Sequence, residues 1–139
     1  DNVIRLKSLK VFAGTGEPQK AVMKLEVMGD VKEATESGDG PVDAIFKCIK
    51  KLYPHEVNLQ LYNVHAVTEG TDAQATVSVR IEENGKTTVG QAANTDTLVA
   101  SADAYLNALN KLIIKRKKTA PEPMDLSGSK YIREKDGTI

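Results

Sequence analysis

The chain has 139 residues and carries 19 basic and 19 acidic side chains, so its formal net charge at pH 7 is zero. This length fits one domain, or two small halves that share a core. With no net charge, the chain has no overall electrostatic attraction to nucleic acid or to a membrane surface. Its longest apolar stretches are far too short to cross a bilayer.

Cysteine content indicates the cellular compartment of the chain, and the start of the sequence indicates whether it is a fragment. The lone Cys48 cannot form an internal disulfide, which favours a soluble cytoplasmic protein. The sequence begins at Asp1 without a methionine and enters a strand pattern almost at once. We therefore expect it to be a piece of a longer polypeptide.

Residues 3–54 predict three antiparallel strands followed by a helix. Apolar side chains alternate imperfectly from Ile4 to a turn at residues 14–18, and alternate again from Ala21 to Val27 before Gly29 turns the chain. The helix would end near a proline, which a helix does not easily pass. Its apolar face has helical spacing and consists of Val42, Ile45, Phe46, Ile49, Leu52 and Tyr53.

A glycine-rich corner joins the third strand to this helix. Gly38 and Gly40 let the backbone bend, Asp39 is expected to cap the helix, and Pro41 suits the first helical position. The start of a helix presents free N–H groups and the positive end of the helix dipole. The corner could therefore seat a carboxylate or a phosphate, although a plain strand-to-helix turn would look the same.

The second half of the chain, residues 55–116, repeats the first. The constant shift along the sequence that places Val11 on Val67 also places Ala44 on Ala100, without a gap. Asn84-Gly85 is the hairpin signal between the second and third strands of this unit, and Thr95 or Asp96 can cap its helix. We predict an α+β fold of two βββα units related by an internal pseudo-twofold, with residues 117–139 as a flexible tail.

Each three-stranded sheet with one helix leaves apolar surface uncovered. A small sheet with an uncovered apolar row is barely stable alone, and the inward residues of the second unit are small. Val22 and Met28 also place apolar side chains on the nominally polar face of the first unit. Because twofold symmetry dominates oligomers, we expect the sheets to pack in a homodimer.

Signals for catalysis and metal binding are weak in this sequence. His55 and His65 have no partner at metal-ligand spacing, and neither a Walker loop nor a dinucleotide fingerprint occurs. Cys48 has no local sign of a catalytic triad, so a small helix residue is the simpler interpretation. The sequence predicts no catalytic residue, no metal and no cofactor in this chain.

One stretch, from Tyr62 to Ala75, could form a small apolar pocket. It combines an aromatic ring with several alanines, and small side chains leave room for a ligand side chain of a few carbons. A carboxylate seat beside such a pocket suits an amino acid. The alanines could equally be small only to let sheets pack, and spacing does not decide between these interpretations.

Three motifs carry a resemblance to a known family. Gly38–Ala44, Tyr62–Ala75, and Asn94-Thr95-Asp96 leading to residues 104–111 resemble the C-terminal regulatory domain of 2-isopropylmalate synthase and the similar citramalate synthase, over about residues 4–114. The resemblance implies a regulatory domain at 1–116 that dimerises and binds the end product of its pathway. The metal-dependent acyltransfer from acetyl-CoA to a 2-oxo acid would take place in a separate TIM barrel of the parent polypeptide, so this fragment would not itself be an enzyme.

The resemblance also implies a set of effector-binding residues. The charged groups of the effector should meet Asp39 and Gly40, with Val42 close by. Its side chain should lie near the dimer interface, among Tyr62, Ala66, Ala73 and Ala75. A carboxylate at position 39 would face the ammonium group of the ligand while backbone N–H groups take its carboxylate.

The identity of the effector rests on the size of one residue. The small Ala66 leaves room for the branched end of leucine, so we expect leucine as a feedback inhibitor of its own biosynthesis. Isoleucine sensing, as in citramalate synthase, is the alternative. A purely structural dimerisation domain is the second alternative, because it would have the same strands and helices.

Overall fold

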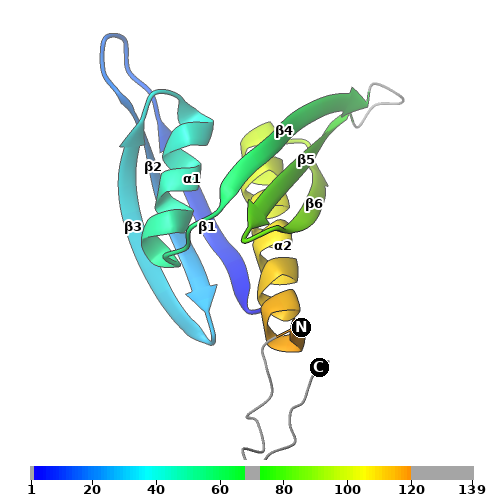
Figure 1. The fold of residues 1–139 in the computed structure, drawn as a ribbon. Coiled ribbons are helices and arrows are strands. Elements are labelled where there is room, and N and C mark those ends of the chain that lie inside the picture. The colour runs from blue at the N-terminus through cyan, green and yellow to red at the C-terminus, as the bar shows by residue number, and fades with distance from the viewer. Residues whose placement is uncertain (1, 68–72, 120–139) are drawn as a thin grey trace, which may run out of the picture.

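A computed structural model describes residues 2–67 and 73–119. The elements follow the order predicted from the sequence (Figure 1), and the expected α+β fold of two βββα units is confirmed. Both sheets are antiparallel, with strand orders β1-β2-β3 and β4-β5-β6. The elements are β1 (Ile4–Phe12), β2 (Gln19–Val27), β3 (Asp30–Gly38), α1 (Pro41–Leu52), β4 (Asn58–Val67), β5 (Gln74–Glu83), β6 (Lys86–Asn94) and α2 (Thr97–Thr119).

The two units are repeats in structure as well as in sequence. The tight turns between their second and third strands, Met28-Gly29 and Asn84-Gly85, all have positive φ, at 50°, 89°, 52° and 81°. This is the shape of a type I′ turn, whose twist matches that of the flanking strands. In both units the register shifts once between the first two strands, at Leu6/Ser8 and at Leu59/Leu61.

The helices differ in how they begin. The helix begins at Pro41, as expected, but the expected cap by Asp39 is wrong: Gly40 is the N-cap, in an extended conformation, and no side chain caps it. Asp43 in the first turn instead reaches back and accepts the Asp39 N–H at 3.0 Å. In the second unit, of the two expected candidates Thr95 and Asp96, Asp96 is the cap, since it accepts the N–H groups of Leu98 and Val99 at 2.9 and 3.4 Å.

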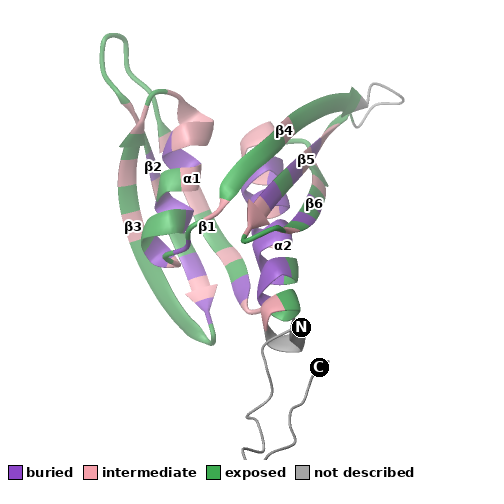
Figure 2. Cartoon of the chain, viewed as in Figure 1, coloured by how far each residue is buried: buried purple, intermediate pink, exposed green. Residues whose placement is uncertain are grey.

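Each helix covers one face of its own sheet, and α2 also joins the units. Helix α1 packs on β2 and β3, whereas α2 packs on β5 and β6 and reaches α1 and β1. Figure 2 shows β3 and β4 exposed along much of their length, with burial concentrated on the middle strands and the helices. One continuous core results, and its fully buried large members include Ile4, Met23, Leu25, Ile45, Ile49, Val77, Val79, Ile81, Leu109 and Leu112.

Two residues of the second unit, Gly90 and Asn110, hold α2 against the strands. A Cβ on Gly90 of β6 would overlap backbone atoms of Ala104 and Ala108, so the helix backbone lies directly on the strand. Asn110 is buried, and its amide holds the start of β1: Oδ1 accepts the N–H groups of Val3 and Ile4 at 2.8 and 2.9 Å, and Nδ2 donates to the Ile4 carbonyl at 2.9 Å.

Helix α2 runs to Thr119, beyond the end expected for the domain at position 116. Arg116 lies in the last turns of α2 and pairs with Glu83 at the end of β5. Its Nε donates to Oε1 at 2.7 Å, and the guanidinium makes a second contact with Oε2. The rest of the predicted tail, residues 120–139, lies outside the described residues.

Candidate functional site

The start of α1 is the first part of the predicted site. Strand β3 comes very close to this helix at Gly38, where a Cβ would lie 2.5 Å from the Ala44 nitrogen. Asp39 is exposed, whereas Gly40 and Val42 are half-buried. Because Gly40 has no capping side chain, no side-chain acceptor caps the first-turn amides of α1. The dipole favours negative charge here.

A second carboxylate stands next to this helix start. The pKa of Asp43 is lowered, first by the hydrogen bond that it accepts from the Asp39 amide and then by Lys47, whose Nζ lies 3.1 Å from Oδ2. Asp43 is therefore ionised near neutral pH. Its carboxylate contacts Asp39 and Lys47 and does not cap the first turn of α1.

The equivalent corner of the second unit is already filled. The shift that relates the two repeats places Gly40 on Asp96, and Asp96 caps α2 with its own carboxylate. Asn94 completes this corner by accepting the Asp96 N–H at 2.8 Å. The two helix starts therefore differ: α2 is capped by a carboxylate of this chain, whereas α1 has no side-chain cap.

Tyr62 links the second sheet to both helices. Its ring meets Phe46 of α1 edge-on, with ring centroids 5.9 Å apart, and its hydroxyl lies 2.7 Å from the Ser101 hydroxyl of α2. Ser101 donates its only hydroxyl hydrogen to the Thr97 carbonyl at 2.8 Å, so Tyr62 is the donor in the bond between them. Tyr62 is thus held against the second turn of each helix.

The alanines of the predicted pocket are only partly brought together. Ala66 of β4 pairs directly with Ala75 of β5, so both lie on the face of the sheet that carries Tyr62. Ala66 is exposed and Ala75 is half-buried. Ala73, which the resemblance places beside the effector side chain, is exposed and precedes β5, which begins at Gln74. Residues 68–72 of the predicted pocket lie outside the described residues.

A contact of Tyr62 with α1 connects the two groups of predicted site residues. Asp39, Gly40 and Val42 lie at the start of α1, and Tyr62 touches the same helix at Phe46. The start of α1 and the end of β4 point away from each other at the top of the view in Figure 1. On the face of β4 next to Tyr62, Leu59 and Val64 remain 46% and 40% exposed, since α2 covers mainly β5 and β6.

A buried histidine at the junction of the units escaped the sequence reasoning, which tested it only as a metal ligand. His55 Nδ1 lies 2.6 Å from the Tyr53 carbonyl, and Nε2 lies 2.8 Å from the Tyr105 hydroxyl. A carbonyl can only accept, so Nδ1 carries the proton and Nε2 accepts from Tyr105. Tyr105 in turn packs on Phe46, with ring centroids 4.5 Å apart.

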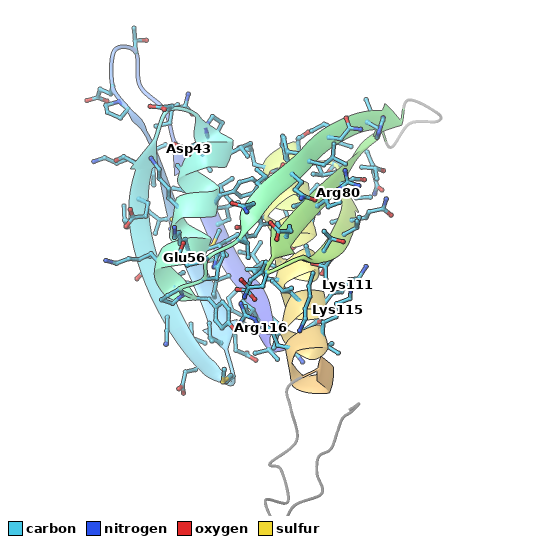
Figure 3. The ribbon with its side chains drawn as sticks, in the orientation of Figure 1. Asp43, Glu56, Arg80, Lys111, Lys115 and Arg116 are labelled. Atoms are coloured by element: carbon cyan, nitrogen blue, oxygen red, sulfur yellow. The ribbon has the colours of Figure 1, made fainter. Side chains whose placement is uncertain are left out.

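The environment of this pair keeps both groups neutral. Burial is the main cause that lowers the pKa of His55, and Lys50 and Arg116 lower it further, against the Tyr53 carbonyl and Glu56. Figure 3 shows Glu56 and Arg116 near this junction. Burial also raises the pKa of Tyr105 to about 12.

Acidification should therefore destabilise the fold through His55. The pKa of this histidine is lower in the folded than in the unfolded chain, so the unfolded chain binds more protons in the window from about pH 6.5 down to the folded value. The stability contributed by neutral His55 is fully present above that window and falls as pH drops through it.

The free energy of unfolding in urea, measured at pH 7.5 and 5.5, should fall more for wild type than for His55→Gln. The matched variant His65→Gln, at an exposed position on β4, should behave as wild type; an equal fall in all three would contradict the assignment.

Cys48 is not a nucleophile in this fold. Its thiol is buried and donates to the Ala21 carbonyl at 3.3 Å, and burial raises its pKa to about 11. Within residues 2–67 and 73–119, no group of three His, Cys, Asp or Glu side chains is arranged to hold a metal ion. No helix in the same part of the chain is long and apolar enough to cross a membrane.

Comparison with known proteins identifies the family. Residues 1–113 match the model of the LeuA allosteric (dimerisation) domain. The chain is similar to proteins named 2-isopropylmalate synthase: 60% identical over 115 residues to that of Bradyrhizobium diazoefficiens, covering 83% of this chain and 22% of the relative, and 57% identical over 125 residues to that of a Caulobacter species, covering 90% and 24%. The chain thus spans less than a quarter of the length of these relatives. The resemblance seen in the sequence is confirmed, and the chain belongs to the family of LeuA allosteric (dimerisation) domains.

Proposed function

We propose that this chain is the part of a 2-isopropylmalate synthase that binds leucine and thereby lowers the activity of a linked catalytic domain. The family description and the names of the relatives support a regulatory domain of such an enzyme. The observation that carries the amino-acid site is the difference between the two helix starts. Of the two helices in the described residues, α1 begins without a capping carboxylate and α2 begins with one.

Recognition of the ligand would divide between the corner and the sheet. The leucine carboxylate accepts from the first-turn amides of α1, where the helix dipole favours it, and Asp39 faces the ammonium group. The leucine side chain lies beside Val42 and Tyr62, over the face where Ala66 pairs with Ala75. Ala73 lies just outside the end of β5 and would border this space.

A second copy of the chain would complete the site. The face of β4 beside Tyr62 keeps Leu59 and Val64 partly exposed, and a homodimer would cover this apolar surface. Condensation of acetyl-CoA with a 2-oxo acid would take place in a metal-dependent barrel elsewhere in the parent polypeptide.

Regulation would follow from the way that Tyr62 touches both helices. Leucine at the start of α1 favours one arrangement of α1, β4 and α2 over another, through the contacts of Tyr62 with Phe46 and Ser101. A ligand shifts such an equilibrium only by its difference in affinity for the two states, and coupling of about 1–3 kcal/mol is typical.

Titration calorimetry with leucine and isoleucine tests this proposal, and Gly40→Asp is the sharpest variant. The position has open space for a Cβ and an extended backbone, so an aspartate there can cap α1 as Asp96 caps α2. Its carboxylate takes the seat of the ligand, and the loss of a charge-assisted bond of about 1.5–3 kcal/mol predicts leucine binding about 10- to 100-fold weaker.

Gly40→Ala is the control for this variant, because it adds the Cβ without the charge and should bind leucine more tightly than Gly40→Asp. Asp39→Ala should also weaken binding, whereas Asp96→Ala should not. Tighter binding of isoleucine by the wild-type chain would indicate a sensor of the citramalate synthase kind. If neither amino acid binds and the dimer is intact, the chain is a purely structural dimerisation domain.

A further inference from the structure

Strand β6 lies at the edge of its sheet, with β5 as its only strand neighbour among the described residues. An edge strand presents a row of unpaired backbone groups to which another strand can add. Here three outward carbonyls of β6 are already occupied by side chains of α2. Lys115 Nζ donates to the Thr87 carbonyl at 2.7 Å, Lys111 Nζ to that of Val89 at 2.7 Å, and Asn107 Nδ2 to that of Gln91 at 2.8 Å.

The geometry of helix and strand makes this row regular. Four residues along a helix advance about 6 Å, and two residues along a strand advance about 6.8 Å. Donors spaced by four on α2 therefore meet carbonyls spaced by two on β6, which runs in the opposite direction. Figure 3 shows Lys111 and Lys115 extending from neighbouring turns of α2. We call Asn107, Lys111 and Lys115 the donor row.

The first unit has no counterpart of the donor row within the described part of the chain. The shift between the repeats places the three donors on Lys51, His55 and Leu59. Helix α1 ends at Leu52, and His55 is bonded to Tyr53 and Tyr105 at the junction of the units. The βββα fold therefore forms without such a row, so the row serves the β6 edge in particular.

The β6 edge would otherwise attract another strand. Val89 of β6 and Ile114 of α2 are 40% and 39% exposed, and both line a hollow of about 370 Å³ between the strand and the helix, together with Lys111 and Lys115. Apolar side chains beside free carbonyls are the features of a strand that self-associates. A second copy of β6 could pair with this edge antiparallel across a twofold axis.

We infer that the donor row closes the β6 edge against strand addition by a second copy of this chain. A strand that adds to a sheet must donate N–H groups to the carbonyls of Thr87, Val89 and Gln91, and the donor row already bonds to all three. It would also have to displace two ammonium groups. This role is independent of effector binding, and it excludes β6 from the surface on which the chain dimerises.

The test is the mass of the chain in solution after the donor row is removed. The variant Asn107→Ala/Lys111→Ala/Lys115→Ala should keep its near-ultraviolet circular dichroism, and its weight-average mass by light scattering should rise to at least twice that of wild type as concentration increases. Amide hydrogen exchange at Val89 and Gln91 should slow in the associated species. A mass equal to that of wild type at all concentrations would overturn the inference.

Two further variants separate the possible causes. Lys50→Ala/Lys51→Ala removes two positive charges from α1 and should keep the wild-type mass; equal association of this variant would assign the effect to net charge and overturn the inference. Lys111→Met/Lys115→Met keeps the aliphatic stems over Val89 and Ile114 while it removes the two Nζ donors. It should associate even if the triple alanine variant does not fold, and a wild-type mass for this folded variant would count against the donor row.

Discussion

Gly90→Ala is expected to destabilise the chain by about 3 kcal/mol, at the upper end of what overpacking costs. The added Cβ meets the backbone of Ala104 and Ala108, and helix backbone cannot swing aside as a side chain can. Helix α2 must therefore move away from β6, which opens gaps around the buried residues of both. Urea unfolding followed by circular dichroism measures the loss.

Gly40→Ala is the matched control for this substitution, because a Cβ there meets no atom within 4 Å. It should cost less than about 1 kcal/mol, the scale of an N-cap change. The equivalent position in the first unit, Ala34, already carries a Cβ, so the demand for glycine belongs to the close packing of α2. Equal losses for the two variants would show that α2 can adjust.

Asn110→Leu is expected to cost about 3 kcal/mol through the loss of three hydrogen bonds to β1 and the residue before it. The leucine fills a similar volume, but the N–H groups of Val3 and Ile4 and the Ile4 carbonyl lose their partners at the edge of the core. Each buried polar group without a partner costs about 1–3 kcal/mol, and water at the half-buried Val3 would recover part of this. The free energy of unfolding in urea gives the total.

Amide exchange locates the effect. The amide of Ile4 should exchange faster in Asn110→Leu, because β1 loses its attachment to α2. Asn107→Ala, on the same helix, removes one exposed hydrogen bond and should cost less than about 1 kcal/mol. If both variants lose the same small amount, Asn110 does not hold the first strand.

Local pattern was enough to predict the elements of this fold. Alternation with a period of two and apolar spacing of three and four residues reflect the geometry of strands and helices, so each βββα unit could be predicted without knowledge of its partner. The spacing between the repeats is an even number, which preserves strand parity, and Asn84-Gly85 forms the predicted turn.

At the start of α1, local sequence pattern predicted the position of the turn but not the residue that caps the helix. The glycines and the proline placed the corner correctly, but the choice of cap failed by one residue. Asp39 and Gly40 both suit a helix start, and their backbone angles depend on how β3 meets the helix at Gly38. In the second unit both Thr95 and Asp96 were candidates, and the structure places Asp96 at the cap position.

By itself, the sequence determined two βββα repeats, their turns, the position of the glycine-rich corner and the family. These depend on neighbours within a few residues, or on motifs read in order. Only the tertiary structure decided that Asn110 holds β1, that His55 bonds to Tyr105, and that Tyr62 bridges two helices. These partners are separated by 106, 50 and 39 residues, and their meeting depends on how the two units pack, which periodicity within one unit does not record.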